Sequence, residues 1–175
     1  PFASGTSFTQ HLKNQINTYR LNENEEIITD FLIGSIDESG YIRRTLDELI
    51  DDLAFTQNIM VDKNTVEKIL RSVQTLDPPG VGARSLQECL SIQLSKKKKD
   101  RPEVEHALSI INDEFDHFSH KHYSKLQERI GITKEELKKT YSNERESNIF
   151  YTFEYKGNIY KMRNSYLKEF KAGYY

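Results

Sequence analysis

The stretch LDPPGVGARSLQECLSIQL, residues Leu76–Leu94, decides how the rest of this sequence is interpreted. The helical spacing of apolar residues stops at Leu76, and two prolines and two glycines follow within the five residues 78–82. Prolines fix φ and remove backbone donors, whereas glycines reach positive φ at little cost. Ser85 followed by Glu88 forms a capping box, which predicts that a new helix begins there. The pattern therefore predicts a rigid corner between two helices.

Helices are predicted upstream of this corner. Apolar residues recur at helical spacing in four segments, Phe8–Tyr19, Ile27–Ile36, Leu46–Leu53 and Val66–Leu76. Thr45 and Glu48 form a capping box for the third segment. Either Asp62 or Asn64 caps the fourth, because a short polar side chain at that position can accept a hydrogen bond from a free backbone N–H.

Further helices are predicted downstream. Apolar residues from Val104 to Phe118 predict one long helix, which Pro102 opens at its first turn. A helix after it ends at Gly131, and Thr133 with Glu136 caps a short successor. A helix, a glycine turn and a capped helix together outline a helix-turn-helix.

The last part of the chain has a different character. Asn148–Tyr155 alternates apolar and polar residues, Gly157-Asn158 is a hairpin turn signal, and Ile159–Met162 can pair back. We expect an all-α fold of two small helical subdomains, a helical bundle plus a helix-turn-helix-like unit, with a possible short β-hairpin near the C-terminus.

Composition points to a charge-rich protein with a modest core. Of the 175 residues, 36% are hydrophobic and 30% are charged. The sequence has no apolar run near the roughly 20 residues of a membrane span and no signal peptide at its start. Cys89 is the only cysteine, which excludes an internal disulfide framework and fits a reducing compartment. We expect a cytoplasmic monomer that does not contact a membrane.

Charge is distributed unevenly along the chain. Residues 20–62 carry three basic and eleven acidic side chains, a balance of −8, whereas residues 63–140 carry fifteen basic and twelve acidic ones, a balance of +3. Because acidic surfaces repel phosphate, we expect no DNA-reading surface in the first third. That third suits docking onto a basic protein surface or is simply a solvated face, and both interpretations are open.

Candidate chemical sites each have a simpler explanation. Cys89 falls on the apolar side of a helix, where a small buried thiol is the usual role. His117 and His120, near Asp113 and Asp116, could bind a metal, but a second ligand pair is missing from the sequence. Exposed histidines in pairs with carboxylates are the favoured explanation of the pattern. We expect no enzyme, no cofactor and no metal.

The opening stretch resembles the signature of the core-binding domain of sigma-54-type bacterial RNA polymerase sigma factors. That family carries LDPPGVGAR, then a polar residue and a helix similar to LQECLxxQL. Ile36–Ile42, IDESGYI, is similar to a family element, LDxxGYL, that joins two helices of the same domain. The resemblance covers roughly residues 20–140. The family's LNPKPG-like turn is absent, so either this branch diverges or the sequence omits residues near Ser142.

The resemblance implies a division of the chain. Residues 1–19 are an N-terminal helix or linker. Residues 20–95 are the first helical subdomain, including the LDPPGVGAR turn, and residues 96–141 are the second. Residues 142–175 are a poorly matched segment with a possible hairpin and a short helix.

The resemblance also implies a function. It indicates a fragment of a sigma-54-like transcription initiation factor that binds core RNA polymerase and supports activator-dependent promoter recognition. Promoter DNA and an ATP-driven activator are expected to meet other regions of the full factor, since this sequence lacks the promoter-reading motif ARRTVxKYRE and a Gln/Leu-rich activator region. The alternative is a helix-turn-helix DNA-binding regulator that uses Gly131–Tyr141. The mixed charges of Lys134–Lys139 favour a structural helical hairpin instead.

Two roles are open for the signature itself, binding core polymerase or joining the subdomains. The residues concerned are Asp77, Pro78, Pro79, Gly80, Val81, Gly82, Ala83, Arg84 and Glu88. The prolines and glycines are typical of a structural corner. Arg84 is the better contact candidate, although it could instead bond to the carboxylate of Asp77 or Glu88, or to the carbonyls that end the previous helix.

Overall fold

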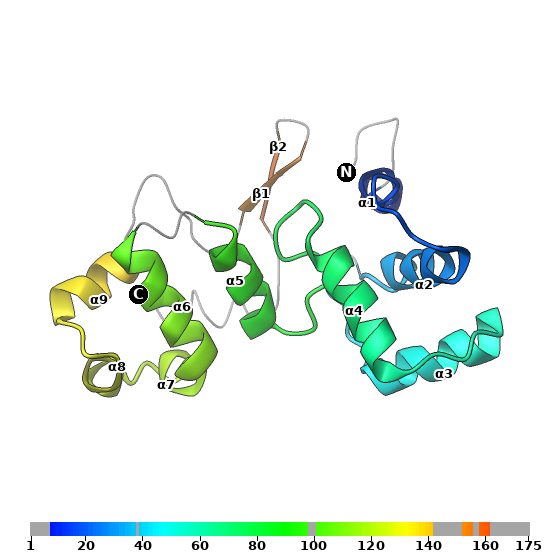
Figure 1. Ribbon diagram of the computed structural model, residues 1–175. Coiled ribbons are helices and arrows are strands. Elements are labelled where there is room, and N and C mark those ends of the chain that lie inside the picture. Colours follow the sequence, from blue (N-terminus) through cyan, green and yellow to red (C-terminus); the bar gives the residue numbers. More distant parts are fainter. Residues whose placement is uncertain (1–7, 38, 98–100, 142–151, 156–157, 162–175) are drawn as a thin grey trace. The chain divides into compact units, whose positions relative to one another are not determined.

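The computed structural model describes residues 8–37, 39–97, 101–141, 152–155 and 158–161. The chain divides into two compact units, Pro1–Ser85 and Leu86–Tyr175. The described residues form nine α-helices and one antiparallel pair of strands (Figure 1). The expected all-α class is confirmed. None of the described helices is both long and apolar enough to cross a membrane.

The first unit contains four helices, α1 Phe8–Ile16, α2 Glu23–Gly34, α3 Leu46–Gln57 and α4 Lys63–Gln74. Three of these helices begin at side-chain caps. Thr45 caps α3 in the predicted capping box with Glu48. Of the two candidates for α4, Asp62 is the cap, because its Oδ1 accepts a hydrogen bond from the Thr65 N–H at 3.0 Å. Asn22 caps α2. The caps satisfy backbone donors that would otherwise lack a partner.

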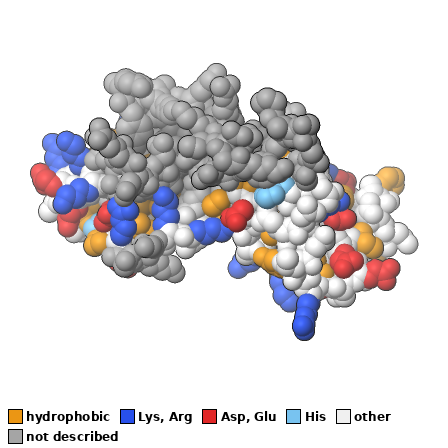
Figure 2. Space-filling model, turned by 90° about the horizontal axis from the view of Figure 1, so that it is seen from above, with side chains coloured by type: hydrophobic (Ala, Val, Ile, Leu, Met, Phe, Trp, Pro, Cys, Tyr) orange, Lys and Arg blue, Asp and Glu red, His pale blue; other side chains and the backbone are white. Residues whose placement is uncertain are grey.

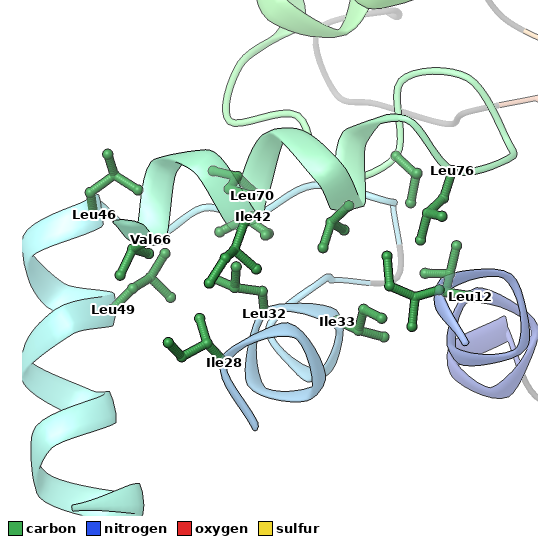
Figure 3. Packing of buried hydrophobic residues seen from close by; sticks show 14 of the residues in the cluster. Leu12, Ile28, Leu32, Ile33, Ile42, Leu46, Leu49, Val66, Leu70 and Leu76 are labelled. Carbon is green, nitrogen blue, oxygen red and sulfur yellow. The ribbon is translucent and has the colours of Figure 1, made fainter. Parts of the chain in front are cut away.

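One hydrophobic core holds the first unit together. All four helices contribute to it, and their side chains point toward one another in Figure 3. Its fully buried members include Leu12, Leu32, Ile42, Leu49, Leu53, Val66, Leu70 and Val73. Ile42 belongs to the loop between α2 and α3, so this loop is part of the core rather than a surface connection.

The second unit contains five helices, α5 Leu86–Ser95, α6 Pro102–Asp113, α7 Phe115–Ser119, α8 Tyr123–Ile130 and α9 Lys134–Tyr141. The single long helix predicted downstream of Pro102 is wrong, because it is divided at Glu114 into α6 and α7. Glu114 leaves the helical conformation (φ −128°, ψ 26°), and its carboxylate accepts a hydrogen bond from Arg129 Nε at 2.6 Å. The Glu114 side chain thus links the start of α7 to α8.

A second core fills this unit. Its buried residues are Leu86, Leu90, Leu94, Ala107, Ile110, Ile111, Phe118, Leu126, Ile132 and Leu137. Gln87 Nε2 donates to the Ile111 carbonyl at 2.8 Å, which fixes α5 on α6. The boundary at Ser85 thus groups α5 with the second unit, whereas the sequence interpretation placed residues 20–95 together.

The strands are β1 Thr152–Tyr155 and β2 Asn158–Lys161. They pair antiparallel, with Thr152 opposite Lys161 and Tyr155 opposite Asn158. Asn158, expected in the turn, therefore starts the second strand. The remaining expectations for this segment, the outer parts of both strands and the short helix, lie outside the described residues.

Candidate functional site

The signature turn closes one end of the first core. Val81 and Ala83 are 1% and 0% exposed, and Pro78, Gly80 and Gly82 are also buried. Within the turn, the Val81 N–H donates to the Pro78 carbonyl at 3.1 Å and the Ala83 N–H to the Gly80 carbonyl at 3.2 Å. The Asp77–Pro78 peptide is cis. Most of the signature is therefore interior structure.

The turn pairs with the second family-like motif, which is distant in sequence. Tyr41 and Ala83 form an isolated parallel bridge. The Gly82 N–H donates to the Gly40 carbonyl at 2.8 Å, and the Ile42 N–H donates to the Ala83 carbonyl at 3.0 Å. The two stretches that carry the resemblance thus form a single hydrogen-bonded structure.

Glycine is favoured where these two segments meet. Gly40 has φ 87° and Gly82 has φ 72°, in the left-handed region that costs a residue with a Cβ atom about 1–2 kcal/mol. The Gly82 carbonyl accepts a hydrogen bond from Gln74 Nε2 at 3.0 Å, and this bond is buried. The backbone of Gly82 is thereby held from two sides, by the Gly40 loop and by α4.

The first helix holds the start of the turn. Gln15 Nε2 donates to the Asp77 carbonyl at 2.7 Å, and the Asp77 N–H donates to Gln15 Oε1 at 2.8 Å. Tyr19 and Thr75 also share a hydroxyl–hydroxyl hydrogen bond. The side-chain amide of Gln15 therefore supplies hydrogen-bond partners for the Asp77 N–H and carbonyl, which lie beyond the end of α4.

Asp37 organises the loop that meets the turn. Its Oδ1 accepts hydrogen bonds from the Ser39 N–H at 2.8 Å and the Tyr41 N–H at 3.0 Å. Its Oδ2 accepts from Arg43 Nε at 3.1 Å, and the Arg43 guanidinium lies 4.2 Å from the centre of the buried Tyr41 ring. The loop therefore delivers Arg43 to the surface in a fixed position.

A hollow opens where the two motifs reach the surface of the first unit. Its volume is about 480 Å³, and it is lined by Ile42, Arg43, Arg44, Thr45, Leu46, Asp47, Lys63 and Arg84. Four of these eight lining residues are basic and one is acidic. Two of the three basic residues in the acidic region 20–62 therefore lie at this one place.

Each basic residue of the hollow has a carboxylate neighbour. Arg43 pairs with Asp37, Arg44 with Asp52, Lys63 Nζ with Asp47 at 3.0 Å, and Arg84 with Glu67 at 3.9 Å. The Arg84 side chain is 36% exposed. Exposed ion pairs of this kind contribute only about 0–1 kcal/mol, so the cations can exchange their carboxylates for those of a partner at small cost.

The residues predicted for this site separate by exposure. Asp77 and Arg84 are exposed and Pro79 is half-buried. Pro78 and the four residues between Pro79 and Arg84 are buried. Glu88 is half-buried in α5 and belongs to the second unit. Within the first unit, Arg84 is the residue of the signature that reaches the hollow.

Sequence reasoning missed the other residues of this corner. Arg43, Arg44 and Lys63 line the hollow, while Gln15 and Gln74 hold the turn. The available signal was the position of the two arginines directly after the IDESGYI motif. That position indicates the hollow only once the IDESGYI motif is known to pair with the LDPPGVGAR turn. This pairing is a long-range contact.

The remaining candidates are located as follows. Cys89 is buried, as predicted from its place on the apolar side of a helix. The His122 imidazole approaches both of the other two: its Nδ1 lies 3.4 Å from His117 Nδ1, and its ring stacks on that of His120 with centroids 5.8 Å apart. His120 Nδ1 also lies 2.7 Å from the Asp116 carbonyl. In the part of the chain that the structure describes, no group of three or more metal-ligating side chains comes together.

The candidate helix-turn-helix has the predicted local geometry. Gly131 ends α8 with φ 73°, and the Glu136 N–H donates to Thr133 Oγ1 at 3.2 Å to start α9. The Glu136 carboxylate accepts the Thr133 N–H at 2.7 Å, which lowers its pKa below the usual range. A carboxylate with a lowered pKa thus sits at the N-terminal end of α9, the end that a recognition helix would insert into the major groove.

Comparison with known proteins decides the family. Residues 2–146 match the family model described as the sigma-54 factor, core binding domain. The chain belongs to this family. The match includes both the IDESGYI and the LDPPGVGAR motifs, which the structure joins. It also includes α1, whose Gln15 bonds to the turn.

Several sigma-54 factors are similar to this chain. The "RNA polymerase sigma-54 factor" of Pseudomonas aeruginosa is 33% identical over 136 residues, which are 78% of this chain and 27% of that protein. The factor of Salmonella typhimurium is 32% identical over 133 residues, 76% of this chain and 27% of that protein. The factor of Xanthomonas euvesicatoria is 37% identical over 109 residues, 62% of this chain and 22% of that protein. The chain thus spans about a quarter of the length of these relatives.

Proposed function

We propose that this chain binds core RNA polymerase as the core-binding portion of a sigma-54-type transcription initiation factor. Its membership in the core-binding domain family carries this proposal. The activity is assembly rather than chemistry, because rigidly held helices present a fixed surface to a partner. Promoter DNA and an ATP-driven activator are then met by other regions of the full factor.

Within this function, we assign different roles to the parts of the signature. Pro78, Gly80 and Gly82 are buried, so their role is to hold the turn against α1 and the Gly40 loop. Arg84 is exposed in the basic hollow and is the contact residue. Charged groups at the edge of an interface steer association and select partners, and an exposed arginine is suited to that task.

The test is binding of the 175-residue chain to core RNA polymerase, compared with binding to duplex DNA at physiological salt. Stable binding to core and weak binding to duplex are expected. Failure to bind core overturns the proposal. Tight duplex binding that weakens steeply with salt would support the alternative, a DNA-binding regulator that uses Gly131–Tyr141.

Reversing one charge tests the assignment of Arg84. Arg84→Glu is expected to weaken core binding about tenfold, or about 1.4 kcal/mol, and to leave helicity and the unfolding midpoint unchanged. The exposed Lys68→Glu on α4 is a matched control, since Lys68 does not line the hollow. If Arg84→Glu also lost helical structure, the residue would have a structural role; if it bound core normally, the hollow would not be the contact.

A further inference from the structure

Two large apolar side chains stand out on the surface of the first unit. Phe55 is 91% exposed and Met60 is 89% exposed. Among the described residues, the third large hydrophobic side chain in the exposed class, Tyr19, reaches only 39%. Full burial of such a side chain is worth about 1.5–3 kcal/mol, so both side chains forgo a large stabilisation in the isolated chain.

Phe55 belongs to a defined stripe of α3. Leu46, Leu49 and Leu53 face the core, whereas Glu48, Asp51 and Phe55 are exposed. Residues three and four apart lie above one another on a helix, so these three form one outward stripe. Met60 lies in the loop that follows α3, and we call the stripe and Met60 together the α3 outer face. This face combines an aromatic ring with carboxylates.

The exposure of Met60 results from an ordered loop. Asn58 ends α3 in the left-handed conformation (φ 54°), and the N–H groups of Asn58 and Ile59 both donate to the Leu53 carbonyl. Ile59 and Val61 pack against the core on either side of Met60. Ile59 and Val61 therefore face inward, and Met60 between them faces outward. The backbone around Met60 is already ordered by its neighbours, so a partner that covers Met60 has to restrict only the side chain.

The charge around this face restricts its partner. α3 carries Asp47, Glu48, Asp51 and Asp52 and no basic residue. Figure 2 shows acidic and hydrophobic side chains close together on the visible surface of the first unit, in the right-hand part of the view. Asp47 and Asp52 pair with Lys63 and Arg44, so Glu48 and Asp51 set the charge of the outward stripe. Two such stripes packed against each other would bring like charges together, and nucleic acid would be repelled. A surface that combines an apolar recess with basic side chains is complementary.

We propose that the α3 outer face docks on core RNA polymerase, with Phe55 and Met60 filling an apolar recess that basic side chains surround. This inference rests on the proposed function and assigns a surface to it. An exposed aromatic ring that becomes buried is the typical centre of an interface, and a methionine adapts its shape to the recess beside it.

Truncation of the two apolar side chains is the direct test. Phe55→Ala and Met60→Ala are each expected to weaken binding to core RNA polymerase at least tenfold, with the unfolding midpoint unchanged. Gln57→Ala is the matched control, because Gln57 is exposed in the same turn of α3 but is polar. Asp51→Lys is expected to weaken binding more at low salt than at high salt, since it reverses a charge in the same stripe.

The outcomes separate this inference from the proposed function. If the parent chain binds core and Phe55→Ala binds equally well, the docking surface lies elsewhere and the proposed function stands. If the parent chain does not bind core, both fail. Sedimentation of the free chain gives a third outcome. A self-association that Phe55→Ala abolishes would identify a second copy as the occupant and overturn the proposal.

Discussion

The Asp77–Arg84 turn and the α3 outer face belong to the same unit and differ in nearly every property. The turn is rich in proline and glycine, mostly buried, and bonded to three other segments. The outer face is made of ordinary helical residues and ends in two apolar side chains exposed by about nine-tenths. The turn is held by hydrogen bonds within the first unit, whereas the outer face has two exposed apolar side chains that a partner can cover.

This difference explains why the strongest sequence signature need not be the contact surface. Positive φ at Gly40 and Gly82 and a close backbone pairing can be met by few residue types. A docking face needs only the correct chemistry at exposed positions, and many residue types can occupy those without disturbing the fold. The signature therefore marks the architecture of the first unit, with Arg84 as its exposed end.

The largest expected effect contrasts the two faces of α3. Leu49 is fully buried, so Leu49→Ala is expected to lower the free energy of unfolding by about 2–5 kcal/mol. Phe55→Ala on the same helix is expected to change it by less than about 0.5 kcal/mol, although it removes more atoms. Urea titration followed by circular dichroism measures both. A substantial loss from Phe55→Ala would mean that this ring supports the fold, and the contrast would collapse.

A smaller effect is expected at the turn. Gly82→Ala is expected to cost about 1–2 kcal/mol, because alanine must adopt φ 72°. A Cβ atom there would lie 3.5 Å from Val73 Cγ1, an ordinary contact, so the cost is in the backbone rather than in a clash. Thermal unfolding of the two proteins gives the difference.

Gly34→Ala is the control for that substitution. Gly34 ends α2, and a Cβ atom there would have no neighbour within 4 Å. Alanine favours helix by about 1 kcal/mol over glycine, so this variant is expected to be as stable as the parent or more stable. If both glycine variants behaved alike, the positive φ of Gly82 would not be what fixes the turn.

Helix starts could be predicted from the sequence because a cap depends on residues three positions apart. Thr45 and Thr133 cap their helices as predicted, and Asp62 is one of the two caps that the sequence offered for α4. The all-α class followed from the same local patterns, because apolar residues repeat at helical spacing. The break at Glu114 was missed, because the apolar residues keep their helical spacing from Val104 to Phe118 and the hydrogen bond from Arg129 to Glu114 is a contact with another helix.

The site was only partly predictable, for a similar reason. Arg84 was identified as a contact candidate by its charge at the end of a rigid turn. Its neighbours Arg43 and Lys63 come from other segments, and only the pairing of Gly40 with Gly82 brings them together. The exposure of Phe55 depends on which face of α3 meets the core. The exposure of Met60 depends on the inward positions of its neighbours Ile59 and Val61.

The smallest effect concerns the carboxylate that starts α3 and lies in its outward stripe. Glu48 Oε2 accepts the Thr45 N–H at 2.7 Å, and this hydrogen bond, with that from the Thr45 hydroxyl, lowers the pKa of Glu48 below its ordinary value. A folded-state pKa below the unfolded one means that the unfolded chain takes up the proton first. The stabilisation is therefore present above the ordinary value near 4.5 and is lost as pH falls through the lower folded value.

Glu48→Gln tests this assignment, because an amide can keep the capping hydrogen bond without titrating. The variant is expected to be nearly as stable as the parent at neutral pH and to lose less stability between neutral pH and the acid range. Part of the acid sensitivity must remain, since hydrogen bonds also lower the pKa of Asp62, Glu103 and Glu136. Urea titrations at a series of pH values give the two profiles. Superimposable profiles would show that the cap of α3 does not depend on the charge of Glu48, and that the outward stripe can be altered at this position without cost to the fold at any pH.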